Sequence, residues 1–324
     1  MILSAGYGTR LWPLTEDRTK PALPILGKPL VGYVAEYLGR FGCHDLIVNL
    51  HHRPQSVRKA LGDGSQFGVS LTYIEEPVIL GTSGALDNAR AFLDHDTFVV
   101  INGKIITNID LDAALATHRQ TKALATLVLM RNQLREKFSV VNVDGVSVKS
   151  FGGMPPPASA DDTVGAPLMF TGVQILEPRI FDYIPRGVFS HSTTDVYPKA
   201  IAAGEQISAH VATGRWYELS TIERYRDINL KLMGEQGRVV WMGSGCRISE
   251  KARVRDSVIW DEVTVEDNAT VHGSILGDGV TVRTGQVVSN ACVVRVELIR
   301  NSAPPPKALA GSILGDNFVV PLAQ

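Results

Sequence analysis

A 17-residue repeat near the end of the sequence constrains the fold most. Apolar residues recur at that interval in three columns, which are Ile248, Val265 and Val282, then Val254, Val271 and Val288, then Val258, Ile275 and Cys292. Short β-branched runs separated by Gly and Asp turns at a fixed period are typical of a β-solenoid, in which each coil stacks on the next. An antiparallel sandwich is the alternative.

The repeat continues beyond these columns. Ser274–Asp278 recurs as Ser312–Asp316, and the three prolines at 304–306 predict a loop that interrupts the coils. The pattern resembles the hexapeptide-repeat left-handed β-helix, whose triangular coil takes about 18 residues.

Strands and helices alternate through the first two thirds of the chain. This order predicts a mostly parallel sheet with helices on both faces, a Rossmann-like α/β domain, and ligands beyond the carboxyl ends of the strands. The loops after Leu3, Ile74 and Ile101 should therefore face one site. The predicted strands are Asp45–Leu50, Val69–Ile74, Thr97–Ile101, Ala125–Met130 and Met169–Leu176, and the predicted helices are Leu30–Phe41, Gln55–Leu61, Ser83–Leu93, Leu111–His118 and Thr194–Ala203.

The predicted α/β domain ends before the repeat. Trp216–Leu219 is a short aromatic strand, and Ser220 or Thr221 can cap a helix that runs to Met233. The glycines at 234 and 237 mark a junction, which divides the chain into a domain at 1–234 and a β-helix at 235–324. The Gly- and Pro-rich stretch Phe151–Pro167 is expected to be a loop over or beside the site.

Composition limits the partners and the compartment. The net charge is −1, with 20% charged residues, so no nucleic-acid partner is expected. Cys43, Cys246 and Cys292 are scattered, which predicts a reducing compartment, the cytoplasm. The first strand begins almost at Met1, so no signal peptide, membrane span or membrane partner is expected.

A glycine-rich run at 2–15, followed by Lys20 and Pro21, predicts a phosphate site. Ala5, Gly6 and Gly8 let the backbone turn sharply, and successive backbone N–H groups there form an anion cradle. Arg10 adds a planar fork of donors and Lys20 a point charge, which together suit a nucleoside triphosphate. The spacing matches neither a Walker loop nor a dinucleotide fingerprint. The alternative is an ordinary turn with solvent-facing cations.

That run resembles the signature of the sugar-1-phosphate nucleotidyltransferases, with Ser4 and Thr19 as substitutions. The resemblance implies attack of a sugar phosphate on the α-phosphorus of an NTP, with release of pyrophosphate. It also implies catalytic roles for Arg10 and Lys20, and nucleotide contacts from Leu3, Ala5, Gly6, Gly8 and Thr9.

Glu76 and the run Leu80–Gly84 match the second motif of that family. The resemblance implies that the base lies against Gly81 and Thr82, although Thr82 or Ser83 could instead cap the following helix. The Glu76 carboxylate only accepts hydrogen bonds, so it slightly favours guanine over uracil. The expected nucleotide is GTP or UTP.

The third motif departs from the family. Asn102 and Gly103 match, but Lys104 stands where the family has the Asp that binds Mg²⁺, and Glu218 stands for the second metal carboxylate. Lys104 cannot be a metal ligand. Lys104 could pair with Glu218 in an inactive homologue, or lie near the metal position with weak catalysis, or be a substitution introduced into an active enzyme.

The sugar side is less defined. Gly172 matches a later family motif, and with Asn102 and Gly103 it is expected to bind the sugar phosphate. Phe151–Pro155 replaces the E-K-P run of many relatives, an arrangement closer to the uridylyltransferases acting on N-acetylmuramic acid phosphate. His272 is single, so no acyltransferase activity is expected from the solenoid.

The predicted function is a nucleotidyltransferase that makes an NDP-sugar from an NTP and a sugar 1-phosphate, with Mg²⁺ weak or absent. The alternative is a catalytically silent paralogue that binds nucleotide sugars. Self-association through the stacked repeats is a further expectation.

Overall fold

The computed structural model describes residues 1–155 and 165–323, and its contacts divide the chain into two compact units. Met1–Ala5, Val34–His51 and Gly62–Trp216 form the first, and Gly6–Tyr33, His52–Leu61 and Tyr217–Gln324 form the second. Residues 156–164 of the predicted loop Phe151–Pro167 lie outside the described part. No helix within the described ranges is both long and apolar enough to cross a membrane.

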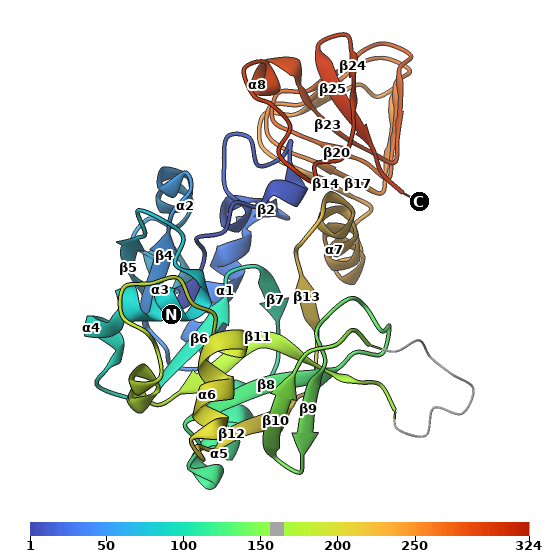
Figure 1. The fold of residues 1–324 in the computed structure, drawn as a ribbon. Helices are drawn as coiled ribbons and strands as arrows, with labels where there is room; N and C mark the ends of the chain where they lie inside the picture. The colour runs from blue at the N-terminus through green and yellow to red at the C-terminus, as the bar shows by residue number, and fades with distance from the viewer. Residues whose placement is uncertain (156–164, 324) are drawn as a thin grey trace. The chain divides into compact units, whose positions relative to one another are not determined.

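The first unit is built on a nine-stranded sheet, counted over its described residues (Figure 1). β11 and β10 run opposite to the other seven strands, so the expected mostly parallel sheet is confirmed. Its order is β5 (Ser70–Glu75), β4 (Asp45–Leu50), β1 (Ile2–Leu3), β6 (Phe98–Asn102), β11 (Leu168–Leu176), β8 (Ala125–Arg131), β12 (Ile207–Val211), β10 (Ser147–Phe151) and β9 (Val141–Asp144).

Apolar side chains of the central strands form the core of this unit. Val100 on β6, Leu127 on β8 and Ile175 on β11 are fully buried. Strands buried on both faces have near-continuous apolar sequences, which is why these three could be located from sequence. β9, β10 and β12 were not predicted. β9 and β10 form an antiparallel hairpin around the turn at Gly145 and Val146. The Asp144–Gly145 pair is a local hairpin signal, but the alternation of strands and helices on which the prediction was based contains no such hairpin.

The helices follow the predictions with two corrections. α1 (Leu30–Arg40), α2 (Pro54–Leu61) and α5 (Leu111–Thr121) lie where expected. The single helix predicted at Ser83–Leu93 is wrong, because α3 (Gly81–Asn88) ends before Ala89 and α4 (Arg90–Leu93) begins after it. The predicted helix at Thr194–Ala203 begins as a π-helical turn at Ser192–Val196 and continues as α6 (Tyr197–Ala202).

Parallel strands stacked at the predicted interval form the β-helix of the second unit (Figure 1). Val258 pairs with Ile275 and Ile275 with Cys292, and the other two columns pair in the same way. The coil strands are β14 (Val240–Met242), β17 (Ser257–Ile259), β20 (Ile275–Leu276) and β23 (Ala291–Arg295); β15 (Arg247–Ile248), β18 (Thr264–Val265) and β21 (Thr281–Val282); and β16 (Arg253–Arg255), β19 (Thr270–His272) and β22 (Val287–Ser289).

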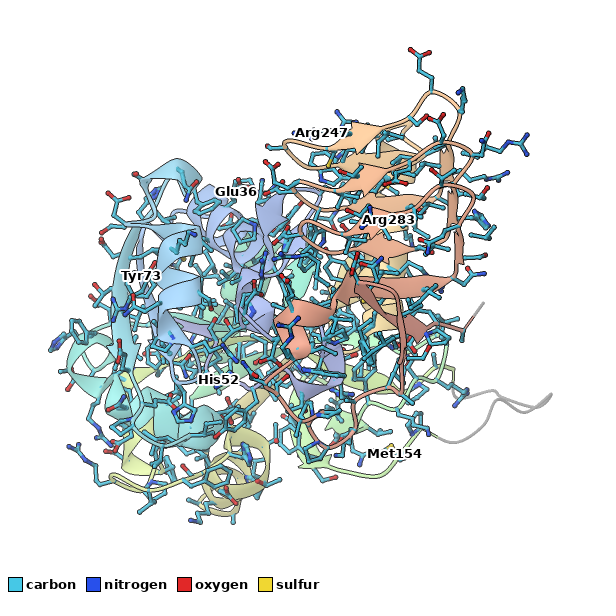
Figure 2. The ribbon with its side chains drawn as sticks, turned by 90° about the horizontal axis from the view of Figure 1, so that it is seen from above. Glu36, His52, Tyr73, Met154, Arg247 and Arg283 are labelled. Atoms are coloured by element: carbon cyan, nitrogen blue, oxygen red, sulfur yellow. The ribbon has the colours of Figure 1, made fainter. Side chains whose placement is uncertain are left out.

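The last copy of the repeat does not form another parallel coil. β24 (Ser312–Leu314) pairs antiparallel with β25 (Asn317–Pro321), which itself pairs antiparallel with β23. The short helix α8 (Val296–Ile299) and the loop around the three prolines lead to β24, which runs in the same direction as β23. The chain reverses between β24 and β25, and β25 lies between β23 and β24 in the sheet. Arg283 projects from the coils (Figure 2) and donates to Glu266 at 3.2 Å and to Asp316 at 2.9 Å, tying the hairpin turn to the solenoid.

Helix α7 (Ile222–Glu235) precedes the solenoid in the second unit. Thr221 is its N-cap, and the Thr221 hydroxyl accepts from the backbone N–H of Arg224 at 3.3 Å, as the sequence predicts. Tyr225 and Asn229 are fully buried one turn apart on this helix. The second unit also contains the antiparallel pair β2 (Pro24–Ile25) and β3 (Lys28–Pro29).

Candidate functional site

Polar contacts connect the carboxyl ends of β1, β4 and β5 in the first unit. The Ser4 backbone N–H donates to the Asn49 side-chain oxygen at 2.7 Å, and the Asn49 amide donates to Glu76 at 2.6 Å. The second Glu76 oxygen accepts from the Leu80 N–H at 3.0 Å. Asn49 and Glu76 are each 3% exposed. The loops after Leu3 and Ile74 thus meet at one edge, as the fold rule predicts.

The Glu76 carboxylate therefore has two intramolecular donors. One fixes it to β4 and the other fixes the start of the loop that leads into α3. A contact between Glu76 and a base would have to share these oxygens, because a carboxylate offers about four acceptor positions. Asn49 was not singled out from sequence, although a polar residue inside an otherwise apolar strand was a signal that could have found it.

The loop at Gly81 and Thr82 is held by a distant segment of the first unit. The Ser83 backbone N–H donates to the Ser190 carbonyl at 3.1 Å, and the two serine hydroxyls bond at 2.9 Å. The Thr82 hydroxyl accepts from the Ser192 N–H at 2.9 Å. His191 Nδ1 lies 3.4 Å from the Thr82 backbone nitrogen, which donates to it. No local sequence signal predicts His191, because it lies 109 residues away.

The residues expected to bind the sugar phosphate also come together. Gly103 N–H donates to the Leu3 carbonyl at 2.8 Å, so the third motif abuts the first. Asn102 packs on Gly172, whose φ of +86° is in the region that glycine favours. Beside it, the Trp216 indole N–H donates to the Thr171 carbonyl at 2.9 Å, and the Trp216 ring meets Phe138 edge-on.

The glycine-rich run that is expected to bind phosphate enters the second unit at Gly6. Gly8 adopts a φ of +70°, and a Cβ there would lie 3.0 Å from Lys20 Cβ, so the glycine turn lies directly on the lysine. Thr9 and Arg10 lie in a 3₁₀ turn, and Lys20 begins a second one. Arg10 is exposed. The two expected catalytic cations thus project from short, ordered turns rather than from a long loop.

The residues expected around Mg²⁺ do not fit a two-carboxylate site. Lys104 is half-buried and contributes a cation. Glu218 is 4% exposed, and Arg224 Nη1 lies 3.9 Å from its carboxylate. No cluster of three or more His, Cys, Asp or Glu suited to a metal occurs in residues 1–155 and 165–323. A dication needs several oxygen ligands, and one carboxylate beside an arginine does not supply them.

Two family models match this chain and show which family it belongs to. Residues 1–235 match the nucleotidyl transferase family model, and residues 234–319 match the GMPPB C-terminal domain. This chain is a member of the nucleotidyl transferase family. The sequence resemblance to sugar-1-phosphate nucleotidyltransferases is thereby confirmed.

Several relatives in this family carry named activities. A UTP–glucose-1-phosphate uridylyltransferase of Synechocystis is 30% identical, covering 84% of this chain and 73% of its own. An N-acetylmuramate alpha-1-phosphate uridylyltransferase of Neisseria meningitidis is 33% identical, covering 70% and 95%. HddC from Yersinia pseudotuberculosis, solved with GMP-PN, has a TM-score of 0.61 at 23% identity, covering 71% and 97%, a likeness of fold.

Proposed function

We propose that this chain transfers a nucleotidyl group from an NTP to a sugar 1-phosphate. A phosphate oxygen of the sugar phosphate attacks the α-phosphorus, the bond from that phosphorus to the bridging oxygen breaks, and pyrophosphate leaves. The observation that carries the proposal is the ordered turn at Gly8 packed on Lys20, inside a chain that belongs to this family. Cations fixed in place before binding stabilise transferring phosphates without reorganisation.

The predicted site residues divide into three groups in this proposal, which bind the triphosphate, the base and the sugar phosphate. Gly6, Gly8 and Thr9, with Leu3 and Ala5 before them, cradle the triphosphate, and Arg10 and Lys20 neutralise its charge. Gly81 and Thr82 receive the base, with Glu76 as their positioning partner through Leu80. Asn102, Gly103 and Gly172 receive the sugar phosphate. No step is assigned to Mg²⁺, because Glu218 and Lys104 do not form the carboxylate pair.

The nucleotide base is proposed to be guanine or uracil. Uridylyl transfer by the Synechocystis and Neisseria relatives supports UTP. The match to the GMPPB C-terminal domain supports GTP. The sugar is not assigned, and a panel of hexose 1-phosphates is needed.

The second candidate function is a catalytically silent binder of nucleotide sugars. Lys104 supports it, because an ammonium carries half the charge of Mg²⁺ and fixes no octahedral geometry. The close Arg224 also supports it, because a guanidinium beside Glu218 opposes the approach of a dication.

Pyrophosphate release tests the two functions. The protein and its Lys104→Asp variant are incubated with GTP or UTP and each hexose 1-phosphate, with and without Mg²⁺. Release by the native sequence that increases in Lys104→Asp with Mg²⁺ supports the enzyme. No release in either form, with nucleotide-sugar binding retained in calorimetry, supports the silent binder. No binding of any nucleotide, with Arg10→Ala unchanged, contradicts both.

We also propose that the chain divides functionally at 234/235 and self-associates through its left-handed β-helix in the cytoplasm. Edge strand β24 supports association, because Ile313 and Leu314 are 65% and 51% exposed on it. The cysteines are free, which suits a reducing compartment. Light scattering tests association, and a strictly monomeric species would contradict it.

A further inference from the structure

Arg18 connects the phosphate-binding segment to the solenoid within the second unit. Its Nε and Nη2 donate to the two oxygens of Asp17, at 2.8 and 2.9 Å, and Nη2 also donates to Asp278 at 2.5 Å. The guanidinium carbon lies 4.8 Å from the ring centroid of Trp260. Burial alone would lower the pKa of Arg18, but the Asp17 and Asp278 carboxylates outweigh it and raise that pKa. The guanidinium is thus fixed and charged.

Asp278 is held in place by the coils and not by Arg18. It belongs to a column spaced by 17 residues, in which Asp261 Oδ1 accepts from the Ser244 N–H at 2.8 Å and Asp278 Oδ1 accepts from the Asp261 N–H at 3.1 Å. Arg295 Nε donates to the Asp278 carbonyl at 3.1 Å. One oxygen of Asp278 therefore belongs to the coil, and the other reaches out to Arg18.

A short path leads from Arg18 to the phosphate cradle. Thr19 follows, and its backbone N–H donates to the Ser56 hydroxyl at 3.1 Å. Lys20 comes next and starts its 3₁₀ turn, with Gly8 lying on its Cβ. Arg18 is therefore two residues from Lys20, and Lys20 packs on Gly8, so this path connects Arg18 to the cradle.

Further contacts from the C-terminal part fix the same segment. The Tyr225 hydroxyl donates to the Pro24 carbonyl and accepts from the Trp260 indole at 2.9 Å. The Leu26 N–H donates to the Asn229 side-chain oxygen at 3.0 Å. Beside Arg18, however, a cavity of about 170 Å³ is lined by Trp241, Trp260 and Asp261 among others. Packing there leaves room for the guanidinium to move once Asp278 stops holding it.

We propose that Arg18 is a positioning residue, through which Asp278 of the solenoid sets the place of Lys20 and so the affinity for the triphosphate. The proposal rests on the proposed function and goes beyond it. It makes the solenoid part of the nucleotide site, although its coils need not touch the ligand.

The test uses matched substitutions in the full chain. Asp278→Asn keeps an oxygen that accepts from the Asp261 N–H but removes the charge facing Arg18. Asp261→Asn makes the same change one coil earlier, where the described carboxylate bond is to the Ser244 backbone. Arg18→Met removes the guanidinium, and Arg18→Lys restores a charge without the fork.

Calorimetry with GTP and UTP is the first readout. We expect Asp278→Asn and Arg18→Met each to weaken nucleotide binding about tenfold, with Arg18→Lys between them and the native protein, because contacting pairs couple by this order. The double variant Arg18→Met/Asp278→Asn should lose no more than either single one, and Asp261→Asn should bind like the native protein. Native affinity in Asp278→Asn, or additive losses in the double variant, would overturn the proposal.

Hydrogen exchange without ligand separates this inference from the proposed function. Faster exchange at residues 6–22 in Asp278→Asn, and not in Asp261→Asn, supports the positioning role even if the native protein binds neither GTP nor UTP, a result that would remove the proposed function. Unchanged exchange there overturns the positioning role even if nucleotide binds.

Discussion

The Asn102 side-chain nitrogen lies 2.2 Å from the place that a Cβ on Gly172 would occupy. Gly172 lies where the register of β11 against β8 shifts, between Phe170 and Gln174. A bulge of this kind bends a strand and lets another group approach its backbone. The glycine of the sugar-side motif therefore admits a protein side chain, and that side chain belongs to the third motif.

Replacing Gly172 by Ala should be strongly destabilising. The positive φ costs about 1 kcal/mol in an L-residue and the overlap with Asn102 about 1–3 kcal/mol more. Urea denaturation should show a loss of about 2–4 kcal/mol. Gly145→Ala is the control, because Gly145 has a φ of +58° and nothing within 4 Å of its Cβ position. The double variant Asn102→Ala/Gly172→Ala should regain the stability lost to the overlap with Asn102 but not the stability lost to the positive φ. Equal losses in the two single glycine variants would contradict the close packing.

Replacing Glu76 by Gln should weaken the junction of β4, β5 and the loop. Gln keeps one acceptor but presents an NH₂ group toward either Asn49 Nδ2 or the Leu80 N–H, both of which are donors. A buried donor left without an acceptor costs about 1–3 kcal/mol, and we expect a loss of that size in urea denaturation. Glu250→Gln, at an exposed position of the β-helix, should change stability by less than about 0.5 kcal/mol. A Glu76→Gln variant as stable as the native protein would show that these bonds carry little energy.

The parts of the fold that could be predicted are those whose structure follows from a pattern of neighbouring residues in the sequence. The columns containing Val265, Val271 and Ile275 fix the coil register because each coil repeats one backbone geometry. In β4 the run Leu46–Val48 is apolar because it is buried. The end of the solenoid could not be predicted. Ser312–Asp316 repeats an earlier coil in sequence, but β24 does not pair with β23, because β25 folds back and pairs antiparallel with both strands.

Some residues of the candidate site could likewise be predicted from sequence and others could not. Gly6, Gly8, Arg10 and Lys20 stand close together in one run of the sequence, so the chemistry of that run could be inferred. Ser190 and His191 could not, since they reach the Gly81 loop only through the tertiary fold. Asp278 is the extreme case, because it lies 260 residues from Arg18 and its sequence context is that of an ordinary coil turn.

Ser4→Ala should not destabilise the protein, although Ser4 is in the signature run. The Ser4 hydroxyl is buried and has no hydrogen-bond partner among the described residues. Removing an unpaired buried hydroxyl should leave stability unchanged or raise it by about 1 kcal/mol. Ser83→Ala provides the contrast, because the fully buried Ser83 hydroxyl bonds Ser190 at 2.9 Å and its loss should cost about 1 kcal/mol. Equal destabilisation by the two substitutions would mean that Ser4 has a partner in solution.

The acid stability of the first unit should depend on Glu177. Glu177 Oε1 lies 2.9 Å from His118 Nε2 and accepts from the Thr97 hydroxyl at 2.8 Å, while His118 is 2% exposed. Partial burial alone would raise the pKa of Glu177, but the hydrogen bonds from His118 and Thr97 and the charges of His118 and Arg179 outweigh it and lower that pKa from 4.5. The carboxylate therefore contributes stability that is fully present above pH 4.5 and is lost as the pH falls through the lower, folded-state value.

Glu177→Gln should accordingly be less stable than the native protein at pH 7, and the difference should narrow as the pH drops below 4.5. Urea denaturation at a series of pH values measures it, as far down as the native protein stays folded. Asp182→Asn, which changes an exposed carboxylate of the same unit, is the control and should change stability at pH 7 by less than about 0.5 kcal/mol. A Glu177→Gln difference that stayed constant down to the acid limit would mean that the carboxylate and its bonds to His118 and Thr97 do not set the acid dependence.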